Sequence, residues 1–189
     1  MEAPLISSIS ISAAERATLL GVARSSLAHH LGLGPLPEVS MPGVLGQPRG
    51  AFVTLRREGE LRGCIGRVQA TSPLALLVAD LVVSAAECDP RFDPVEAAEL
   101  ELLTISISVL APPRPLASPA DLRIGLDGAM VRLGWHRGVL LPTVALERGW
   151  DAETLLRHTC LKAGLWPEAW EDPRATVEAF EAQEFGDER

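Results

Sequence analysis

The sequence is poor in basic residues, in aromatic residues and in cysteine. Its 17 lysines and arginines stand against 25 aspartates and glutamates, which gives a net charge of −8. This balance argues against a whole-molecule basic surface for nucleic acid, although a local basic groove is compatible with it. Tyrosine is absent, and the four tryptophans are expected in the core rather than on a surface that stacks bases. Three cysteines without paired spacing argue against a disulfide framework and predict a reducing cytoplasm.

Long apolar runs are also missing. The longest, residues 74–86, is interrupted by Asp80 and is too short to span a bilayer. Residues 1–12 have no positively charged start, so no secretion signal is expected. We therefore predict a cytoplasmic protein without a membrane partner.

Motifs for metals and phosphates are missing as well. The sequence contains neither His-Glu-x-x-His nor Cys-x-x-Cys. His158 and Cys160 lie two residues apart on a predicted helix and so do not share a face. We expect no metal site and no cofactor. A doubly wound nucleotide-binding fold is disfavoured, because no glycine-rich turn of phosphate-loop spacing joins a strand to a helix.

What the sequence does contain is hydrophobic periodicity of both helical and strand type. Ser12 and Glu15 form a capping-box pattern, Ser72-Pro73 predicts a helix start, and Asp127-Gly128 predicts a hairpin turn. The expected helices are residues 13–31, 74–88 and 152–163. The expected strands are residues 50–56, 61–68, 103–109, 121–126, 129–133, 139–141 and 176–185.

These elements predict an α+β fold. The hairpins favour a mixed, mainly antiparallel sheet, and the helix at 74–88 is apolar almost all round, so it is expected to be buried. We expect one domain over residues 1–189, a description that two closely packed lobes would also satisfy.

Short motifs follow one another along nearly the whole chain in a recognisable order. They are Pro48-Arg49-Gly50, Phe52-Val53-Thr54-Leu55, Leu61-Arg62-Gly63-Cys64-Ile65-Gly66, Asp89-Pro90-Arg91-Phe92, Ile124-Gly125 with Asp127-Gly128, Leu140-Leu141-Pro142-Thr143-Val144, and Lys162-Ala163-Gly164-Leu165 with Trp170. In this set and order the chain resembles the AMMECR family. One position departs from the family's pattern, which usually has Gln where this chain has Thr143.

The resemblance implies a larger and a smaller lobe around a cleft. It also implies membership of the AmmeMemoRadiSam system, in which a Memo-like protein and a radical SAM protein would be separate companions. The family has no established biochemical activity, so the resemblance supplies no reaction.

Cys64 is the first candidate for chemistry. Glycine inside a strand marks a bulge or a close backbone approach, and Cys64 lies next to Gly63. In a regular strand Arg62 would point to the same face, where its guanidinium would increase the thiolate fraction. Such a thiol is suited to act as a nucleophile or covalent carrier. The alternative is a small buried hydrophobe, with the glycine present only to let a helix pack closely.

Arg91 is the candidate anchor for an anion, because the guanidinium fork suits carboxylate or phosphate. Its alternative is an internal ion pair with Asp89 or Glu87. The remaining candidate ligand-binding residues are Gly63, Gly66, Asp89 and Thr143.

Two main hypotheses of function follow. In the first, the chain is a component of a biomolecule-modification system, and a cleft with a primed Cys64 binds an anionic small molecule or a modified residue. In the second, it is a non-catalytic binding or scaffold module for the Memo-like and radical SAM proteins. A third, nucleic-acid association, is disfavoured by the charge of −8. The sequence does not decide whether the chain is an enzyme.

Overall fold

The structure, a computed structural model, describes residues 9–69 and 71–187. Residues 1–8, where no secretion signal was predicted, lie outside the described residues. The chain divides into two compact units. We call residues 10–110 with 183–189 the N-terminal unit, and residues 111–182 with 1–9 the C-terminal unit. No helix in the described part of the chain is long and apolar enough to cross a membrane.

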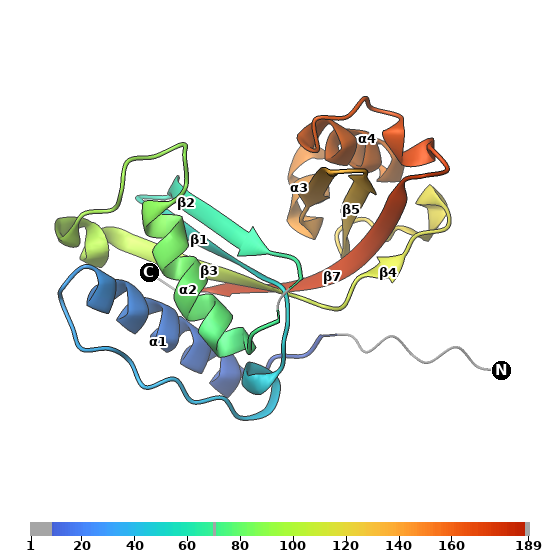
Figure 1. Ribbon diagram of the computed structural model, residues 1–189. Coiled ribbons are helices and arrows are strands. Elements are labelled where there is room, and N and C mark those ends of the chain that lie inside the picture. Colours follow the sequence, from blue (N-terminus) through green and yellow to red (C-terminus); the bar gives the residue numbers. More distant parts are fainter. Residues whose placement is uncertain (1–8, 70, 188–189) are drawn as a thin grey trace. The chain divides into compact units, whose positions relative to one another are not determined.

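The N-terminal unit is an antiparallel sheet with two helices on one face (Figure 1). Its main elements are α1 (Ala13–His30), β1 (Ala51–Arg57), β2 (Glu60–Arg67), α2 (Leu74–Glu87) and β3 (Leu103–Leu110), with short 3-10 helices at Gly43–Gly46 and Ala97–Leu102. The strands lie in the order β2-β1-β3, so β2 is an edge strand. The predicted capping box of α1 is confirmed, since Ser12 and Glu15 bond each other's backbone N–H groups.

α2 is the buried central helix that the sequence predicts, with eight of its residues buried. It packs against the sheet at Gly63 of β2, where an added Cβ would lie 2.1 Å from the carbonyl oxygen of Ala85. Glycine is therefore required there for close backbone approach rather than for a special torsion angle.

The C-terminal unit is a second antiparallel sheet with its own core. Its main elements are β4 (Arg114–Pro115), β5 (Asp127–Leu133), β6 (His136–Leu140), α3 (Pro142–Arg148), α4 (Ala152–Lys162) and β7 (Thr176–Gly186), with 3-10 turns at Pro119–Asp121 and Ala169–Glu171. β7 pairs with both β4 and β5, and β5 pairs with β6. The last residues of β7 belong to the N-terminal unit. The strand predicted at 176–185 is confirmed.

One face of this second sheet packs on α4. Ala129 and Val131 of β5 share a core with Leu155 and Leu156 of α4. Gly138 of β6 repeats the arrangement seen at Gly63, because an added Cβ would lie 2.1 Å from the Thr159 carbonyl oxygen of α4. Each unit thus brings a hairpin strand and a helix into backbone contact through a glycine.

The predicted turn at Asp127-Gly128 is wrong. Both residues lie in β5, pairing with Glu181 and Phe180 of β7, and residues 122–126 form no strand. Asp127 is fully buried and bound by two arginines, while Gly128 makes room for the Phe180 ring. These long-range contacts override the local turn preference. The hairpin turn lies instead between Leu133 and His136, where Gly134 has φ +60°.

Two further points of the secondary structure differ from the expectation. Pro73, not Ser72, is the N-cap of α2, because the Leu74 N–H donates to the Gln47 carbonyl and needs no side-chain cap. The short helix α3 was not predicted.

The tryptophans were expected in the core. Trp150 and Trp170 do pack against the core of the C-terminal unit, whereas Trp135 and Trp166 are exposed.

We predict that Gly63→Ala destabilises the protein by about 3 kcal/mol, since α2 and β2 must separate to admit the Cβ. Urea denaturation at neutral pH measures the effect. Gly21→Ala is the matched control: Gly21 lies in α1 with no atom within 4 Å of an added Cβ. The control should raise stability by about 0.5–1 kcal/mol. Equal effects of the two substitutions would contradict the packing role of Gly63.

Candidate functional site

The candidate site is organised by Asp89, two residues beyond the end of α2. Its side chain is buried, and its Oδ2 atom accepts the backbone N–H of Cys64 at 2.9 Å. Arg91 donates from Nε to Oδ1 at 2.9 Å and from Nη2 to Oδ2 at 2.6 Å. These bonds from Arg91, with a smaller contribution from the Cys64 N–H, hold the pKa of Asp89 well below its usual range despite burial.

Cys64 lies on the sheet face that α2 does not cover. Gly63 faces α2, and neighbouring residues of a strand point to opposite faces. Cys64, Thr54 and Ser106 stand opposite one another on β2, β1 and β3. The Thr54 hydroxyl donates to the Cys64 Sγ at 3.3 Å. The thiol is half-buried, in contrast to exposed Cys88 and buried Cys160.

Arg62 does not occupy the position that a regular strand would give it. Leu55 pairs with Gly63 and Arg56 with Leu61, so Arg62 is the extra residue of a β-bulge. Its guanidinium binds Glu99 through Nε and Nη2, each at 3.0 Å. Further bonds go to the carbonyl oxygens of Asp93 and Pro94. The guanidinium is therefore committed to the 93–99 segment, and the expectation that it accompanies Cys64 on one face is wrong.

Arg91 is the arginine that shares the environment of Cys64. The pKa of Arg91 is raised, chiefly by its hydrogen bonds to Asp89 and to a smaller extent by the Cys64 thiol. The ion pair with Asp89 that the sequence offered as an alternative is present. It leaves the side chain 54% exposed, however, and Nη1 has no hydrogen-bond partner among residues 9–69 and 71–187. Arg91 can thus be held in place and still receive an anion.

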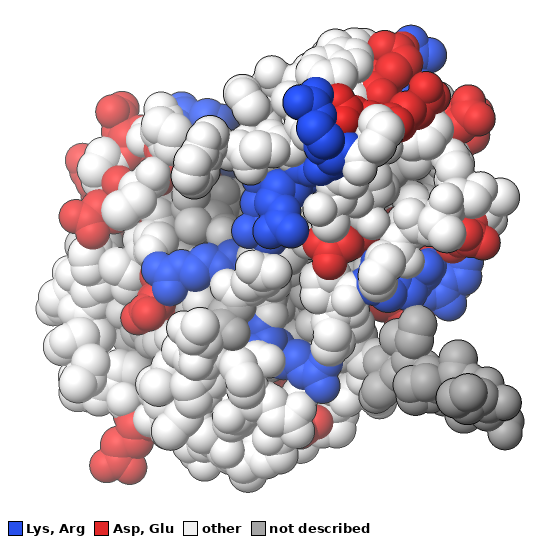
Figure 2. All heavy atoms as spheres, turned by 45° about the vertical axis from the view of Figure 1, so that its right-hand side comes forward, with Lys and Arg blue, Asp and Glu red and all other residues white. Residues whose placement is uncertain are grey.

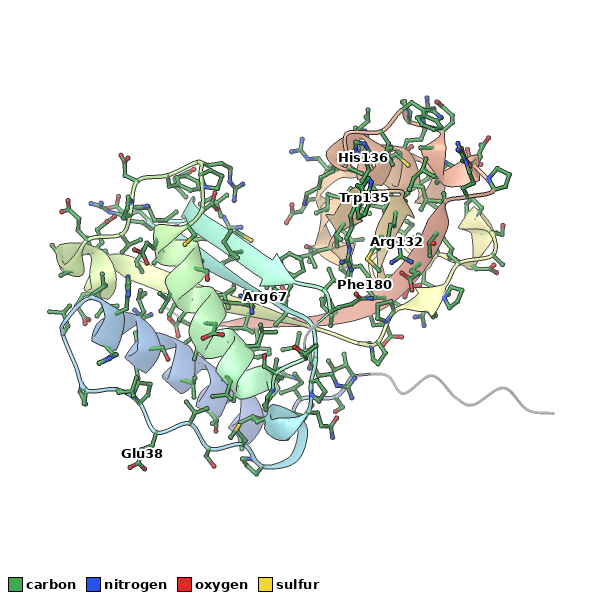
Figure 3. The ribbon with its side chains drawn as sticks, viewed as in Figure 1. Glu38, Arg67, Arg132, Trp135, His136 and Phe180 are labelled. Atoms are coloured by element: carbon green, nitrogen blue, oxygen red, sulfur yellow. The ribbon has the colours of Figure 1, made fainter. Side chains whose placement is uncertain are left out.

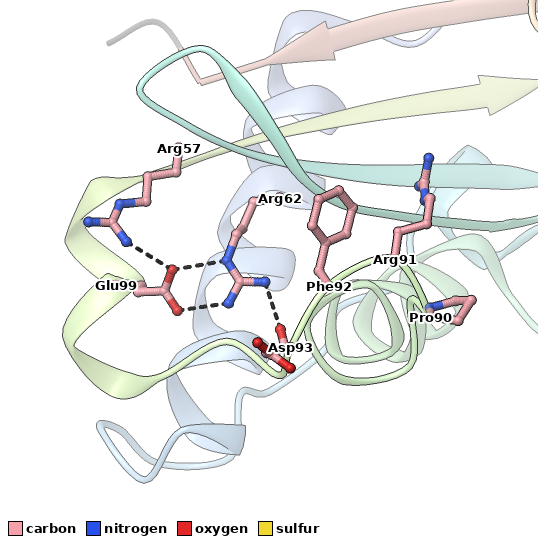
Figure 4. A pocket seen from close by; sticks show the side chains of 7 residues that line it. All are labelled: Arg57, Arg62, Pro90, Arg91, Phe92, Asp93 and Glu99. Atoms are coloured by element: carbon pink, nitrogen blue, oxygen red, sulfur yellow. Dashed lines mark hydrogen bonds and ion pairs between the residues drawn. The ribbon is translucent and has the colours of Figure 1, made fainter.

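A cavity of about 540 Å³ opens beside this arginine (Figure 4). It is lined by Arg57, Arg62, Pro90, Arg91, Phe92, Asp93 and Glu99. Arg57 donates to Glu99 at 3.3 Å, and the Arg91 guanidinium lies 5.4 Å from the centre of the Phe92 ring. Cys64 is not among the lining residues. The cavity therefore combines guanidinium groups with one aromatic ring.

The Asp-Pro-Arg sequence of the site occurs a second time in the chain. In Asp172-Pro173-Arg174 the arginine binds the aspartate through its backbone N–H, Nε and Nη2, at 2.9, 3.0 and 2.7 Å. Arg91 binds Asp89 through the same three donors. The geometry of the Arg91–Asp89 pair is thus a local property of Asp-Pro-Arg. The first copy differs because its carboxylate also holds the Cys64 N–H and because a cavity lies beside it.

The remaining predicted residues are placed as follows. The space beside Gly63 is occupied by the backbone of Ala85. The space beside Gly66 is occupied by the Phe52 ring, where an added Cβ would lie 2.1 Å from a ring carbon. Thr143 lies in the first turn of α3, in the C-terminal unit. Within the described ranges no three metal-ligating side chains cluster.

Sequence reasoning missed Thr54, Arg57 and Glu99. Only Glu99 carried a local signal, since Glu96 and Glu99 form a capping box at the start of a 3-10 helix.

A model of the AMMECR1 family matches residues 20–185. The chain belongs to the AMMECR1 family. It is 47% identical over 180 residues to a protein of Methanothermobacter thermautotrophicus, covering 90% of this chain and 93% of that one. It is 41% identical over 180 residues to a protein of Methanopyrus kandleri, covering 90% and 87%.

The AMMECR1 fold is also seen in a crystal structure of an uncharacterized protein from Pyrococcus horikoshii. The TM-score is 0.81 at 36% identity, over 90% of each chain. The resemblance that the sequence motifs indicate is thereby confirmed, as is the α+β fold. None of these AMMECR1 relatives has a name that states an activity.

We predict that Glu99→Gln lowers the free energy of unfolding by about 1–3 kcal/mol at pH 7, because Arg62 loses its charged partner. Hydrogen bonds from Arg62 lower the pKa of Glu99 from 4.5 to about 2. A depressed pKa stabilises the folded state above the unfolded pKa, and this stabilisation is lost as pH falls. The difference from the unsubstituted protein should therefore shrink between about pH 5 and pH 2.

Urea denaturation across this pH range measures the Glu99 effect. The control is Glu60→Gln on β2, since Glu60 is exposed and has no ion pair with any described residue. If the loss of unfolding free energy caused by Glu99→Gln does not change with pH, the ion pair with Arg62 is not the source of that loss.

Proposed function

We propose that this AMMECR1 protein binds an anionic small molecule, or an anionic group on a modified residue, in the Arg91 cavity. The observation that carries the proposal is the state of Arg91: Asp89 fixes it at one edge, Nη1 has no hydrogen-bond partner in the described part of the chain, and a cavity of about 540 Å³ lies beside it. A guanidinium held in this way loses little conformational entropy on binding a carboxylate or phosphate.

The other groups around the cavity favour the same class of ligand. The Arg57 side chain makes one hydrogen bond to the described residues and is 44% exposed, so it can turn toward an anion. Arg62 and Glu99 neutralise each other and give the cavity a rigid wall. The Phe92 ring offers a surface for a planar ligand group. We expect the bound anion to bridge Arg91 and Arg57.

We propose further that Cys64 is the reactive group of this site, as nucleophile or covalent carrier. The Thr54 hydroxyl donates to its sulfur, and Asp89 connects its backbone to Arg91. Reactive cysteines are found in such partly exposed surroundings with a cation nearby. The chain would then act as a component of a biomolecule-modification system together with Memo-like and radical SAM proteins.

A non-catalytic scaffold is the second candidate function. It is favoured by the structural roles of the motif around Cys64: Arg62 binds Glu99, and Gly63 lets α2 approach the strand closely. In this case the same Memo-like and radical SAM partners would bind to the surface, and the thiol would take no part.

We predict that Arg91→Gln weakens phosphate binding at least about tenfold, because one charge-assisted fork is lost. The probe is inorganic phosphate, titrated against ¹⁵N-labelled protein while the arginine Nε–H signals and the Phe92 amide are followed. Arg91→Lys should also lose most of the phosphate affinity, since an ammonium group has no fork with which to bind Asp89 and an anion at the same time.

Arg174→Gln is the matched control for Arg91→Gln. Arg174 has the same Asp-Pro-Arg geometry but does not line the cavity. The control should leave binding unchanged. If phosphate shifts the Arg174 signals as strongly as those of Arg91, the anion binds any exposed guanidinium and the cavity has no special role.

We predict that iodoacetamide alkylates Cys64 faster than Cys88 at pH 7, although Cys64 is the less exposed of the two. Thr54→Val should slow the alkylation of Cys64 several-fold, because the lost hydrogen bond contributes about 1 kcal/mol. The alkylation rate of Cys88 should not change. Peptide mass spectrometry resolves the sites. Cys160 serves as the unreactive reference, because burial raises the pKa of its thiol.

The reverse order of reaction, Cys88 before Cys64 with no effect of Thr54→Val, would remove the support for a reactive thiol. The scaffold function would then be preferred, and anion binding at Arg91 would stand or fall by its own titration.

A further inference from the structure

Trp135 is the most exposed large apolar side chain in the described part of the chain, with a relative accessibility of 102%. It lies in the two-residue turn between β5 and β6 of the C-terminal unit, next to Gly134 (Figure 3). Trp150 and Trp170 of the same unit pack against its core. A fully exposed indole offers a large planar surface to a partner, and tryptophan and arginine are among the side chains most enriched at binding hot spots.

Two arginines stand opposite each other directly below this turn. Arg132 of β5 pairs in register with Arg137 of β6. Like charges in directly opposite positions of an antiparallel pair destabilise a sheet. Neither arginine has a carboxylate partner among the described residues, and Arg137 donates only to the Met130 sulfur, at 3.0 and 3.3 Å. The unit therefore maintains two uncompensated guanidinium groups side by side.

The arginine pair lies on the face of the sheet that α4 does not cover. The next pair along the hairpin, Leu133 with His136, has the opposite orientation. The His136 Nδ1 lies 3.0 Å from the Ala163 carbonyl oxygen at the end of α4. Arg132 and Arg137 therefore point away from α4.

Four other arginines of this unit, Arg114, Arg123, Arg157 and Arg174, are neutralised by ion pairs, whereas Arg148 has none with any described residue. Arg114 and Arg123 both bind the buried carboxylate of Asp127, and Arg123 also binds Glu181. On the face that Figure 2 shows, acidic side chains lie next to several of the basic ones. The β5–β6 hairpin thus differs in placing two unpaired cations in directly opposite positions of neighbouring strands.

We propose that the end of the β5–β6 hairpin binds a phosphate joined to a nucleobase. The phosphate would lie between the guanidinium groups of Arg132 and Arg137, and the base would stack on the Trp135 indole. This chemistry is found in a free nucleotide and in each residue of a single-stranded nucleic acid. The site lies outside the Arg91 cavity and does not depend on it.

The two features of the hairpin select this ligand class together. A phosphate relieves the repulsion of the arginine pair and matches the guanidinium fork. The indole requires a planar partner, and stacking of a base on an aromatic side chain is tolerant of sequence. An acidic peptide would satisfy the arginines but would leave the indole without a planar group. A duplex needs a longer basic surface than two arginines provide.

The test measures binding of a fluorescein-labelled dT10 oligonucleotide to the full chain by fluorescence anisotropy at 50 mM and 150 mM salt. We expect Trp135→Ala to weaken binding about tenfold and Trp135→Phe to restore part of it, because phenylalanine retains a stacking face. Arg132→Gln should lower the slope of log K against log salt by about 0.7, the value for one phosphate contact. Each substituted side chain is exposed, so unfolding does not confound the result.

Matched controls come from the same unit. Trp166→Ala removes another exposed tryptophan, and Arg148→Gln removes an exposed arginine on α3 without an ion pair to any described residue. Both should bind dT10 as the unsubstituted protein does. Competition separates the two sources of the ligand: displacement by AMP at equal nucleotide concentration indicates a mononucleotide site, whereas displacement only by unlabelled dT10 indicates a strand.

Three results would overturn the proposal. They are absence of dT10 binding at 50 mM salt, equal losses for the hairpin variants and their controls, and displacement by a glutamate oligopeptide as effective as displacement by dT10. The last result would identify the hairpin as a surface for acidic protein segments.

Discussion

A buried carboxylate must be surrounded by donors, and this requirement at Asp89 determines the arrangement of the candidate site. A lone buried charge costs several kcal/mol, so Asp89 can be buried only because Arg91 and the Cys64 N–H both donate to it. The bond to Cys64 occupies a polar group of the edge strand β2 and attaches the loop after α2 to that strand. The position of the Arg91 cavity therefore follows from the satisfaction of a single side chain.

In this arrangement the two arginines of the family motifs, Arg62 and Arg91, have different roles. Arg62 is the extra residue of a bulge, and Glu99 and two carbonyl groups hold its guanidinium in place, so it contributes rigidity. Arg91 uses only one edge of its guanidinium internally. The Arg62 side chain makes four hydrogen bonds with its five N–H donors, whereas the Arg91 side chain makes two and retains more donors for a ligand. An arginine in an ion pair can therefore still bind a ligand when some of its guanidinium N–H groups remain unpaired.

Local patterns were sufficient where local forces decide the structure. The capping box at Ser12 and the alternation along residues 103–109 placed α1 and β3 to within a residue or two, and the Asp151 cap placed α4. The failures have long-range causes. The turn expected at Asp127-Gly128 is overridden by Arg114 and by Phe180, which are distant in the sequence.

The candidate site shows the same division. Cys64 and Arg91 could be singled out from motifs, but the bulge that turns Arg62 toward Glu99, 37 residues away, could not be read from the chain. Gly63 and Gly138 place each helix backbone directly on its hairpin, 2.1 Å from where a side chain would begin. With no side-chain layer between them, helix and strand have little freedom to slide past each other. A displacement of the β2 hairpin would therefore move α2 with it as a rigid body.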